Sequence, residues 1–158
     1  MRRGAGQIGA LILACAPWVA LDASELSRAA DLRAEAGAAA RTGQPLIVIY
    51  SRDDCRFCQT IKREYLGPMA ADTQRGKRLM IREIGQDRDT PLIDFQGQPT
   101  THTAFATREK IKLVPVVAFY GPNGRKLAEP IVGTRLPDFY QSYLDDAIEQ
   151  ASRKLKQP

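Results

Sequence analysis

The chain has 158 residues, a formal net charge of +5 at pH 7, three cysteines and one histidine. This length suits one domain with one sizeable core and leaves no room for a second domain. The cysteines and histidine are too few for a disulfide-stapled scaffold or a four-ligand zinc site, so we expect no metal and no cofactor. The basic clusters, which are Lys62-Arg63, residues 75–78 and Arg82, lack interleaved aromatic residues and a nucleic-acid motif. We therefore expect solvated basic faces, or an acidic protein partner, and no nucleic acid.

Residues 1–23 resemble an export signal, in which two arginines precede an apolar run at residues 8–20 and small residues follow. The run is short for a transmembrane helix, and charged residues follow it at once. We expect cleavage near residue 23, a mature domain of residues 24–158 and a periplasmic location. An alternative rests on residues 12–15, which resemble the lipobox of bacterial lipoproteins and would place a lipid on Cys15.

The first elements of the mature domain are a helix, a strand and a second helix. Residues 24–41 are rich in Ala, Glu and Arg with a weak apolar stripe, which predicts an amphipathic helix. Residues 46–50 are branched or aromatic without polar alternation, which predicts a strand covered on both faces. The apolar period then becomes helical over residues 57–66, and Gly67 and Pro68 predict the end of that helix.

A Cys-x-x-Cys pair lies where this strand passes into the helix. A helix N-terminus stabilises an anion and lowers a cysteine pKa from about 8.5 to between about 3.5 and 7.5. Cys55 is therefore the expected nucleophile, and Cys58, one turn further, the expected resolving thiol. Arg56 favours a Cys55 thiolate, whereas Asp53 and Asp54 oppose it if they point inward. We predict a net lowering of the Cys55 pKa to below about 8.

Other interpretations of the cysteine pair stay open. A structural disulfide across so small a loop would restrict the unfolded chain little, which favours a catalytic pair. A non-catalytic binding module, or a metallochaperone that holds Cu(I) between two thiolates, would also keep both cysteines. Phe57 offers a flat apolar surface for a peptide beside the sulfur, unless its ring faces the core.

The middle of the chain is polar and rich in turns. Residues 79–84 predict a second strand. The polar segment that follows contains a possible hairpin at residues 94–97, and residues 101–110 are compatible with a short helix. His102 and Phe105 in that helix are interpreted as packing or surface residues rather than ligands.

The C-terminal third begins with the apolar residues 113–120. Pro115 would remove a hydrogen-bond donor from a central strand, so it should stand at the start of the strand. A turn follows, and residues 125–128 are expected to pair back as a further strand. Pro137 opens the last helix, whose apolar face extends to residue 151. The predicted order is helix, strand, helix, strand, helix, strand, strand, helix, which is an α/β class.

This order, with Cys-x-x-Cys after the first strand and Val114-Pro115 opening the third, resembles the thioredoxin fold over the whole predicted mature domain. The resemblance implies a central mixed sheet of about four strands flanked by helices, with an insertion at about residues 85–110. It implies that Pro115 is cis and lies against the cysteine pair, and that the Val114 backbone pairs with an extended client segment. Arg56, Phe57, Val114 and Pro115 are accordingly the expected client-binding residues.

Two departures from thioredoxin concern the chemistry. Cytoplasmic thioredoxin has Gly-Pro between its cysteines, where this chain has Arg56-Phe57. Six residues before the first cysteine, thioredoxin buries an aspartate that helps to deprotonate the resolving thiol, and this chain has Ile49. Water or another group, for which Glu83 is a candidate, would have to serve instead. Gly133 falls where family members keep a glycine near the site.

Within the superfamily, the chain most resembles the periplasmic thioredoxins of bacterial sulfur-oxidation (Sox) and cytochrome-maturation systems. The likeness rests on the export signal, the Tyr-Ser-x-x-x-Cys-x-x-Cys approach and the insertion. It implies a monomeric protein disulfide reductase in sulfur oxidation. Its client would carry a disulfide or a reactive cysteine. A membrane thiol-electron carrier would keep the reductase itself in the reduced state. The alternatives are reduction of apocytochrome c, net oxidation, or isomerisation, although an isomerase usually dimerises through an added domain.

Overall fold

A computed structural model describes residues 26–72, 79–134 and 137–157, so the expected signal segment and Cys15 lie outside the described residues. The elements are α1 (Leu32–Arg41), β1 (Leu46–Ser51), α2 (Arg56–Ile61), the π-helical turn η1 (Lys62–Leu66), α3 (Gly67–Ala71), β2 (Met80–Gly85), β3 (Pro91–Ile93), β4 (Pro99–Thr101), α4 (His102–Arg108), β5 (Val116–Tyr120), the 3₁₀ turns η2 (Pro122–Gly124) and η3 (Pro137–Phe139), β6 (Ile131–Val132) and α5 (Tyr140–Leu155). None of the helices in these ranges is long and apolar enough to cross a membrane.

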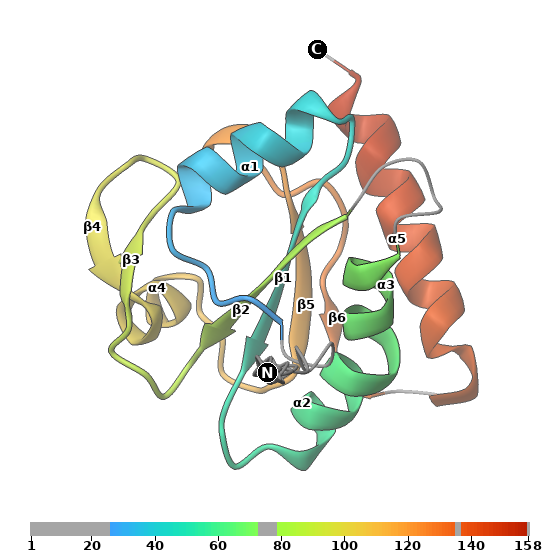
Figure 1. Cartoon of the computed structure of the whole chain (residues 1–158), viewed down its shortest axis with the longest axis horizontal. Coiled ribbons are helices and arrows are strands. Elements are labelled where there is room, and N and C mark those ends of the chain that lie inside the picture. Colours follow the sequence, from blue (N-terminus) through green and yellow to red (C-terminus); the bar gives the residue numbers. More distant parts are fainter. Residues whose placement is uncertain (1–25, 73–78, 135–136, 158) are drawn as a thin grey trace, which may run out of the picture.

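A four-stranded mixed sheet in the order β2-β1-β5-β6 forms the centre of the domain (Figure 1). β1 runs parallel to β2 and antiparallel to β5, and all six of its residues are buried because helices cover both faces. Val48 and Tyr50 face the core beneath α1 and α4. Ile47 and Ile49 face the core beneath α2, α3 and α5. The predicted α/β architecture with a central mixed sheet is confirmed.

The first helix is shorter than predicted. The interpretation of residues 24–41 as one helix was wrong, because α1 begins only after Asp31, whose side chain caps the helix N-terminus. The residues before it run extended beside β2. The Ala29 N–H donates to the Glu83 carbonyl at 2.9 Å, and the Glu83 N–H donates to the Ser27 carbonyl at 3.0 Å. This pairing satisfies the backbone N–H and carbonyl of Glu83 at the edge of β2, which a helix over the same residues could not do.

The helix that follows β1 is longer than predicted, since Gly67 and Pro68 do not end it and the helical path continues to Ala71. The intervening turn η1 is π-helical, and the Gly67 N–H donates to the carbonyl of Lys62, five residues back. A π turn changes the hydrogen-bond spacing at the point where Pro68 lacks an N–H, so the helix passes the proline. Leu66 is fully buried and ties this turn to the core.

The edge of the sheet beyond β5 also differs from the prediction. Residues 125–128 form no regular strand, and only Tyr120 and Lys126 make a bridge there. The edge strand is β6, which pairs with the first two residues of β5. The Leu127 side chain is buried, and Pro130, which has no N–H to donate, separates this segment from β6.

The predicted hairpin is confirmed: β3 and β4 pair antiparallel around a turn. One Asp94 carboxylate oxygen accepts the N–H groups of Gln96 and Gln98, and Gly97 takes the positive φ of 80° that the turn requires. The predicted helix after it is α4, and the predicted last helix is α5, preceded by the turn η3 that begins at Pro137.

His102, the first residue of α4, is completely buried and joins three segments. Its Nδ1 accepts the Gly85 N–H at 3.1 Å, and its Nε2 donates to the Ala29 carbonyl at 2.9 Å. Because a carbonyl only accepts, the neutral ring carries its proton on Nε2. Burial lowers the pKa of His102. The residue therefore packs inside the fold, as its interpretation as a packing residue predicts.

Candidate redox site

The two cysteines form a disulfide at the start of α2, with Cα atoms 5.3 Å apart. Cys55 is the N-cap residue, and its sulfur accepts the Cys58 N–H at 3.1 Å. Cys55 is half-buried and Cys58 is fully buried, so an incoming partner reaches the Cys55 sulfur first. Within residues 26–72, 79–134 and 137–157, no three His, Cys, Asp or Glu side chains are grouped as a metal site requires.

The two aspartates before Cys55 are each held by an arginine. Asp54 pairs with Arg52 at 2.9 Å, and Asp53 pairs with Arg88 from the loop after β2. Both carboxylates are mostly exposed to solvent. Water and the guanidinium groups thus screen their repulsion of a Cys55 thiolate, and the lowering of the Cys55 pKa stays a prediction.

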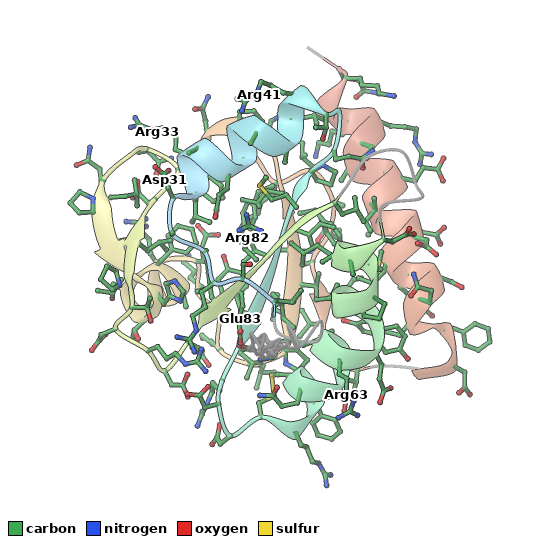
Figure 2. All side chains as sticks on the ribbon, viewed as in Figure 1. Asp31, Arg33, Arg41, Arg63, Arg82 and Glu83 are labelled. Carbon is green, nitrogen blue, oxygen red and sulfur yellow. A yellow bond between two sulfur atoms is a disulfide. The ribbon has the colours of Figure 1, made fainter. Side chains whose placement is uncertain are left out.

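A buried polar cluster of Glu83, Lys62 and Ser51 joins β2 and the last residue of β1 to the helical segment that follows Cys58. The Lys62 ammonium lies 2.8 Å from Glu83 Oε1, and the Ser51 hydroxyl donates to the same oxygen. The Glu83 side chain is 3% exposed and that of Lys62 11%. Figure 2 labels Glu83 near the lower end of β2, the strand end nearest the disulfide.

Glu83 lies beside the position of Ile49, at which the chain lacks the buried aspartate of thioredoxin. In the register of β1 and β2 it stands directly opposite Ile49, so the two side chains share one face of the sheet. Lys62 follows Cys58 by one helical turn, which brings its ammonium and the bound carboxylate to the helix that carries the resolving cysteine. The buried acid is present in this protein, on the neighbouring strand.

Sequence reasoning missed the role of Lys62. Its interpretation as a member of a solvated basic cluster with Arg63 was wrong, because Lys62 is buried whereas Arg63 is exposed. Lys62 lies four residues after Cys58, on the buried stripe of the helix. A buried ammonium needs a partner, and this need points to the one carboxylate in the apolar strand β2, Glu83.

Arg56 and Phe57, two of the expected client-binding residues, lie on the surface beside Cys55. The Phe57 ring is 49% exposed, so it does not face the core. The Arg56 guanidinium carbon lies 4.8 Å from the centre of that ring, in a cation–π contact. Together they present a flat apolar surface that carries a positive charge.

Val114 and Pro115, the other two, lie at the same end of the sheet. The bond between them is cis, as the resemblance implies. The next residue, Val116, stands opposite Tyr50, one residue before the end of β1. The Gly133 N–H donates to the Pro115 carbonyl at 2.8 Å, and Gly133 has a positive φ of 73° that favours glycine. The register therefore places the cis-proline loop near the chain that leads to Cys55.

A half-buried sulfur at a helix start that follows a central strand, bonded to a buried sulfur in the first turn of that helix, defines a thioredoxin-like thiol–disulfide oxidoreductase. A family model described as a thioredoxin-like domain matches residues 32–148, and the chain belongs to that family. A search of curated proteins finds no relative.

Solved structures resemble the chain at low sequence identity. A thioredoxin-fold protein from Helicobacter pylori is 10% identical, with a TM-score of 0.52, over 72% of this chain and 81% of its own. Oxidized mitochondrial thioredoxin 3 from Saccharomyces cerevisiae is 12% identical, with a TM-score of 0.48, over 80% of this chain and 96% of its own. The oxidised C-terminal domain of DsbD from Neisseria meningitidis is 16% identical, with a TM-score of 0.47, over 72% of this chain and 90% of its own. At these identities the likeness concerns the fold alone.

Proposed function

We propose that this protein is an exported protein disulfide reductase that works in the periplasm. The observation that carries the proposal is the asymmetry of its disulfide, in which Cys55 is accessible and Cys58 is buried, one helical turn before the lysine that binds the buried Glu83 carboxylate. The Cys55 thiolate attacks a client disulfide, forms a mixed disulfide and releases one client thiolate. Cys58 then loses its proton and attacks the Cys55 sulfur, which releases the second client thiol. Two electrons pass from the protein to the client, and the two client thiolates take up protons from water or from the group that received the Cys58 proton.

The cluster of Glu83, Lys62 and Ser51 supplies the acceptor for the Cys58 proton. A buried thiol becomes a nucleophile only after deprotonation, and a carboxylate held near it by fixed hydrogen bonds is suited to receive the proton. This assignment extends the role that thioredoxin gives to its buried aspartate to a residue on the adjacent strand.

The direction of electron flow and the partners rest on the family resemblance. A membrane thiol-electron carrier would reduce the Cys55–Cys58 disulfide after each cycle. The client would be a protein with a disulfide or a reactive cysteine, in bacterial sulfur oxidation. The surface at Arg56 and Phe57 supports a protein client, because it offers apolar contact area next to the accessible sulfur.

The reduction potential of the couple tests the direction. We expect the mature domain, equilibrated with glutathione buffers, to give a potential below about −220 mV, which would make it a reductant. A potential near about −120 mV is typical of an oxidant and would overturn the reductase assignment.

Trapping and N-terminal sequencing test the remaining parts. A Cys58→Ser variant should accumulate mixed disulfides with its clients, which reducing agent releases, and a Cys55→Ser variant should accumulate none. Absence of adducts with Cys58→Ser would favour a binding module. Protein isolated from the periplasm should begin near residue 24, whereas a lipid-modified Cys15 would support the lipoprotein alternative.

A further inference from the structure

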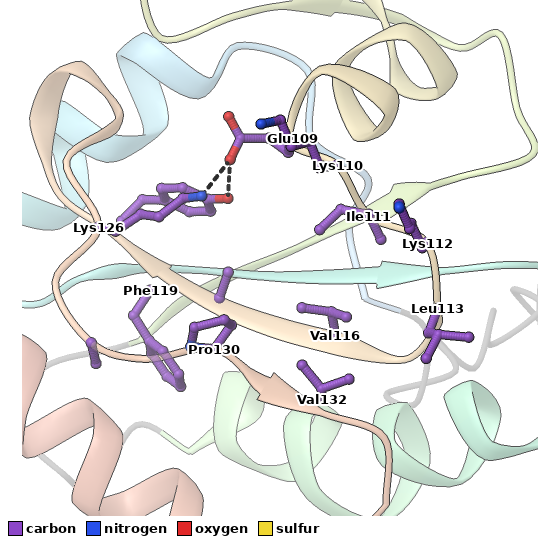
Figure 3. A pocket seen from close by; sticks show the side chains of 13 residues that line it. Glu109, Lys110, Ile111, Lys112, Leu113, Val116, Phe119, Lys126, Pro130 and Val132 are labelled. Carbon is purple, nitrogen blue, oxygen red and sulfur yellow. Dashed lines mark hydrogen bonds and ion pairs between the residues drawn. The ribbon is translucent and has the colours of Figure 1, made fainter.

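An apolar groove of about 300 Å³ begins next to the cis-proline loop (Figure 3). Its floor is the face of β5 that also belongs to the core under α1, with Val116 and Ala118. Leu113 and Val132 stand at the end nearest the redox site, and they are among the exposed large apolar side chains of the described chain. Val132 pairs with Val116 in register, so both side chains lie on the groove side of the sheet.

The groove exists because α4 is only seven residues long and lies beside β2 and the hairpin, away from β6 (Figure 1). After α4 the chain crosses to β5 as residues 109–113, which form one wall. The segment around Lys126, Ala128 and Pro130 forms the other wall. Its exposed apolar end directly adjoins the loop that carries Val114, so the groove continues the expected client surface onto a second face of the sheet.

The far end of the groove carries polar groups that already satisfy one another. The Tyr120 hydroxyl lies 2.7 Å from that of Tyr50 and donates to Glu109 Oε2 at 3.3 Å. The Lys126 ammonium pairs with the same carboxylate oxygen at 3.0 Å. Glu109 is therefore neutralised by an ion pair inside the groove and leaves no free negative charge for a ligand.

Two further lysines give the rim an unbalanced positive charge. Lys110 and Lys112 are exposed, and neither pairs with a carboxylate within the described part of the chain. The groove on the other side of β6 has the opposite character. It is lined by Glu129, Asp146 and Glu149, and its single arginine, Arg153, is paired with Glu149. An acidic segment is attracted to the first groove and repelled by the second.

We propose that this groove binds a client segment in which an apolar side chain is flanked by Asp or Glu residues, close to the client disulfide. The apolar side chain packs against Val116, Ala118 and Val132, and the carboxylates pair with Lys110 and Lys112. The inference rests on the proposed function, because the bound segment delivers its sulfur to Cys55. It adds the chemistry by which a client is chosen.

Synthetic peptides test this selection. Each peptide carries one cysteine as a mixed disulfide with 5-thio-2-nitrobenzoate, and the cysteine is flanked by Glu-Leu-Glu, Lys-Leu-Lys or Glu-Ser-Glu. The reduced protein becomes the Cys55–Cys58 disulfide in a single turnover and releases the peptide thiol and the coloured thiolate, so absorbance reports the second-order rate constant of the reaction. We expect the Glu-Leu-Glu peptide to react about tenfold faster than the Lys-Leu-Lys peptide, and several-fold faster than the Glu-Ser-Glu peptide.

Matched variants assign the preference to the groove. Lys112→Glu should remove most of the charge preference. Lys156→Glu makes the same charge change at the end of α5 and should keep the preference. Val132→Ser should remove the preference for leucine over serine, whereas Tyr143→Ser should keep it, although both side chains are 42% exposed.

A small neutral disulfide, 2-hydroxyethyl disulfide, separates the two proposals. If the protein reduces it but reacts equally fast with all three peptides, the groove inference is overturned and the reductase stands. The same holds if Lys156→Glu alters the preference as much as Lys112→Glu. If the protein reduces neither this compound nor any peptide, the proposed function and the groove inference both fail.

Discussion

Two ion pairs near the cysteines in the sequence differ in their burial. The pair of Lys62 and Glu83 is almost completely buried, whereas in the pair of Arg52 and Asp54 the Asp54 side chain is 69% exposed. Both pairs join a carboxylate to a cation at 2.8 to 2.9 Å. Charges in water interact weakly, whereas removing one partner of a buried pair leaves a charge that the interior does not solvate. The burial of a pair, rather than the distance between its charges, therefore decides how much stability the protein loses when one partner is removed.

Replacing Lys62 should have the largest effect. Lys62→Met leaves the Glu83 carboxylate buried without its cation, so we expect the free energy of unfolding to fall by about 3–5 kcal/mol at pH 7. Urea titration followed by circular dichroism measures the change. The double variant Lys62→Met/Glu83→Leu should regain most of the loss, because no unpaired charge remains. A loss below about 1 kcal/mol in the single variant would show that water reaches the pair.

Replacing Glu83 tests the chemistry as well as the fold, because Glu83→Gln also leaves the buried Lys62 ammonium without its counter-charge and should lower the free energy of unfolding. Glu83→Gln keeps the size of the side chain and removes the proton acceptor, so we expect the attack of Cys58 on the mixed disulfide to slow by about 100-fold near pH 7. Rapid mixing of the reduced protein with a peptide disulfide, followed by acid quench, measures this step. Glu35→Gln is the control, because Glu35 is likewise paired with a cation, Arg82, at 2.7 Å, and belongs to α1, which packs on the other face of the sheet. Equal rates in both variants would remove Glu83 from the mechanism.

His102 extends the comparison to a buried group without a partner charge. Its pKa in the folded protein is lowered, so below pH 6.5 the unfolded chain binds more protons, and stability falls as the pH decreases. Protonation also removes the acceptor of the Gly85 N–H, at a cost of about 1–3 kcal/mol. Unfolding measured at pH 7.5 and 5.5 should show a larger decrease for the wild type than for His102→Gln. Equal decreases would contradict this assignment.

Removing the exposed aspartate should have the smallest effect. Asp54→Asn should alter the free energy of unfolding by less than about 0.5 kcal/mol, because the pair with Arg52 is solvated. The Cys55 pKa, followed by thiolate absorbance in the reduced protein, should lie below about 8 and fall slightly further in this variant. A wild-type value of 8.5 or above would contradict the predicted activation of Cys55.

Local pattern sufficed for much of the fold. The run that became β1 and the spacing of the cysteines each carry their signal within a few residues, and so does the turn at Gly97. The start of α1, in contrast, cannot be predicted from the neighbouring residues. Residues 26–31 have the composition of a helix, but backbone pairing with β2 decides their conformation, and that pairing joins residues more than 50 positions apart.

The redox site likewise has residues that the sequence identifies and residues that it does not. The motif identifies Cys55 and Cys58, and the Val-Pro step identifies the cis bond before β5. Lys62 was assigned to the surface, because burial of a lysine depends on a partner in another strand. The groove could not be predicted either, since it results from the length and placement of α4, which no local pattern specifies.

The extended residues before α1 also bear on solubility. They pair with Glu83 on the outer side of β2, so the backbone N–H and carbonyl of that residue are not available to another molecule. At the opposite side β6 is only two residues long and follows Pro130, which leaves little template for strand addition. A shortened form that lacks residues 26–30 would uncover β2, and we expect it to aggregate. A design that fuses a partner to this domain should therefore keep those residues.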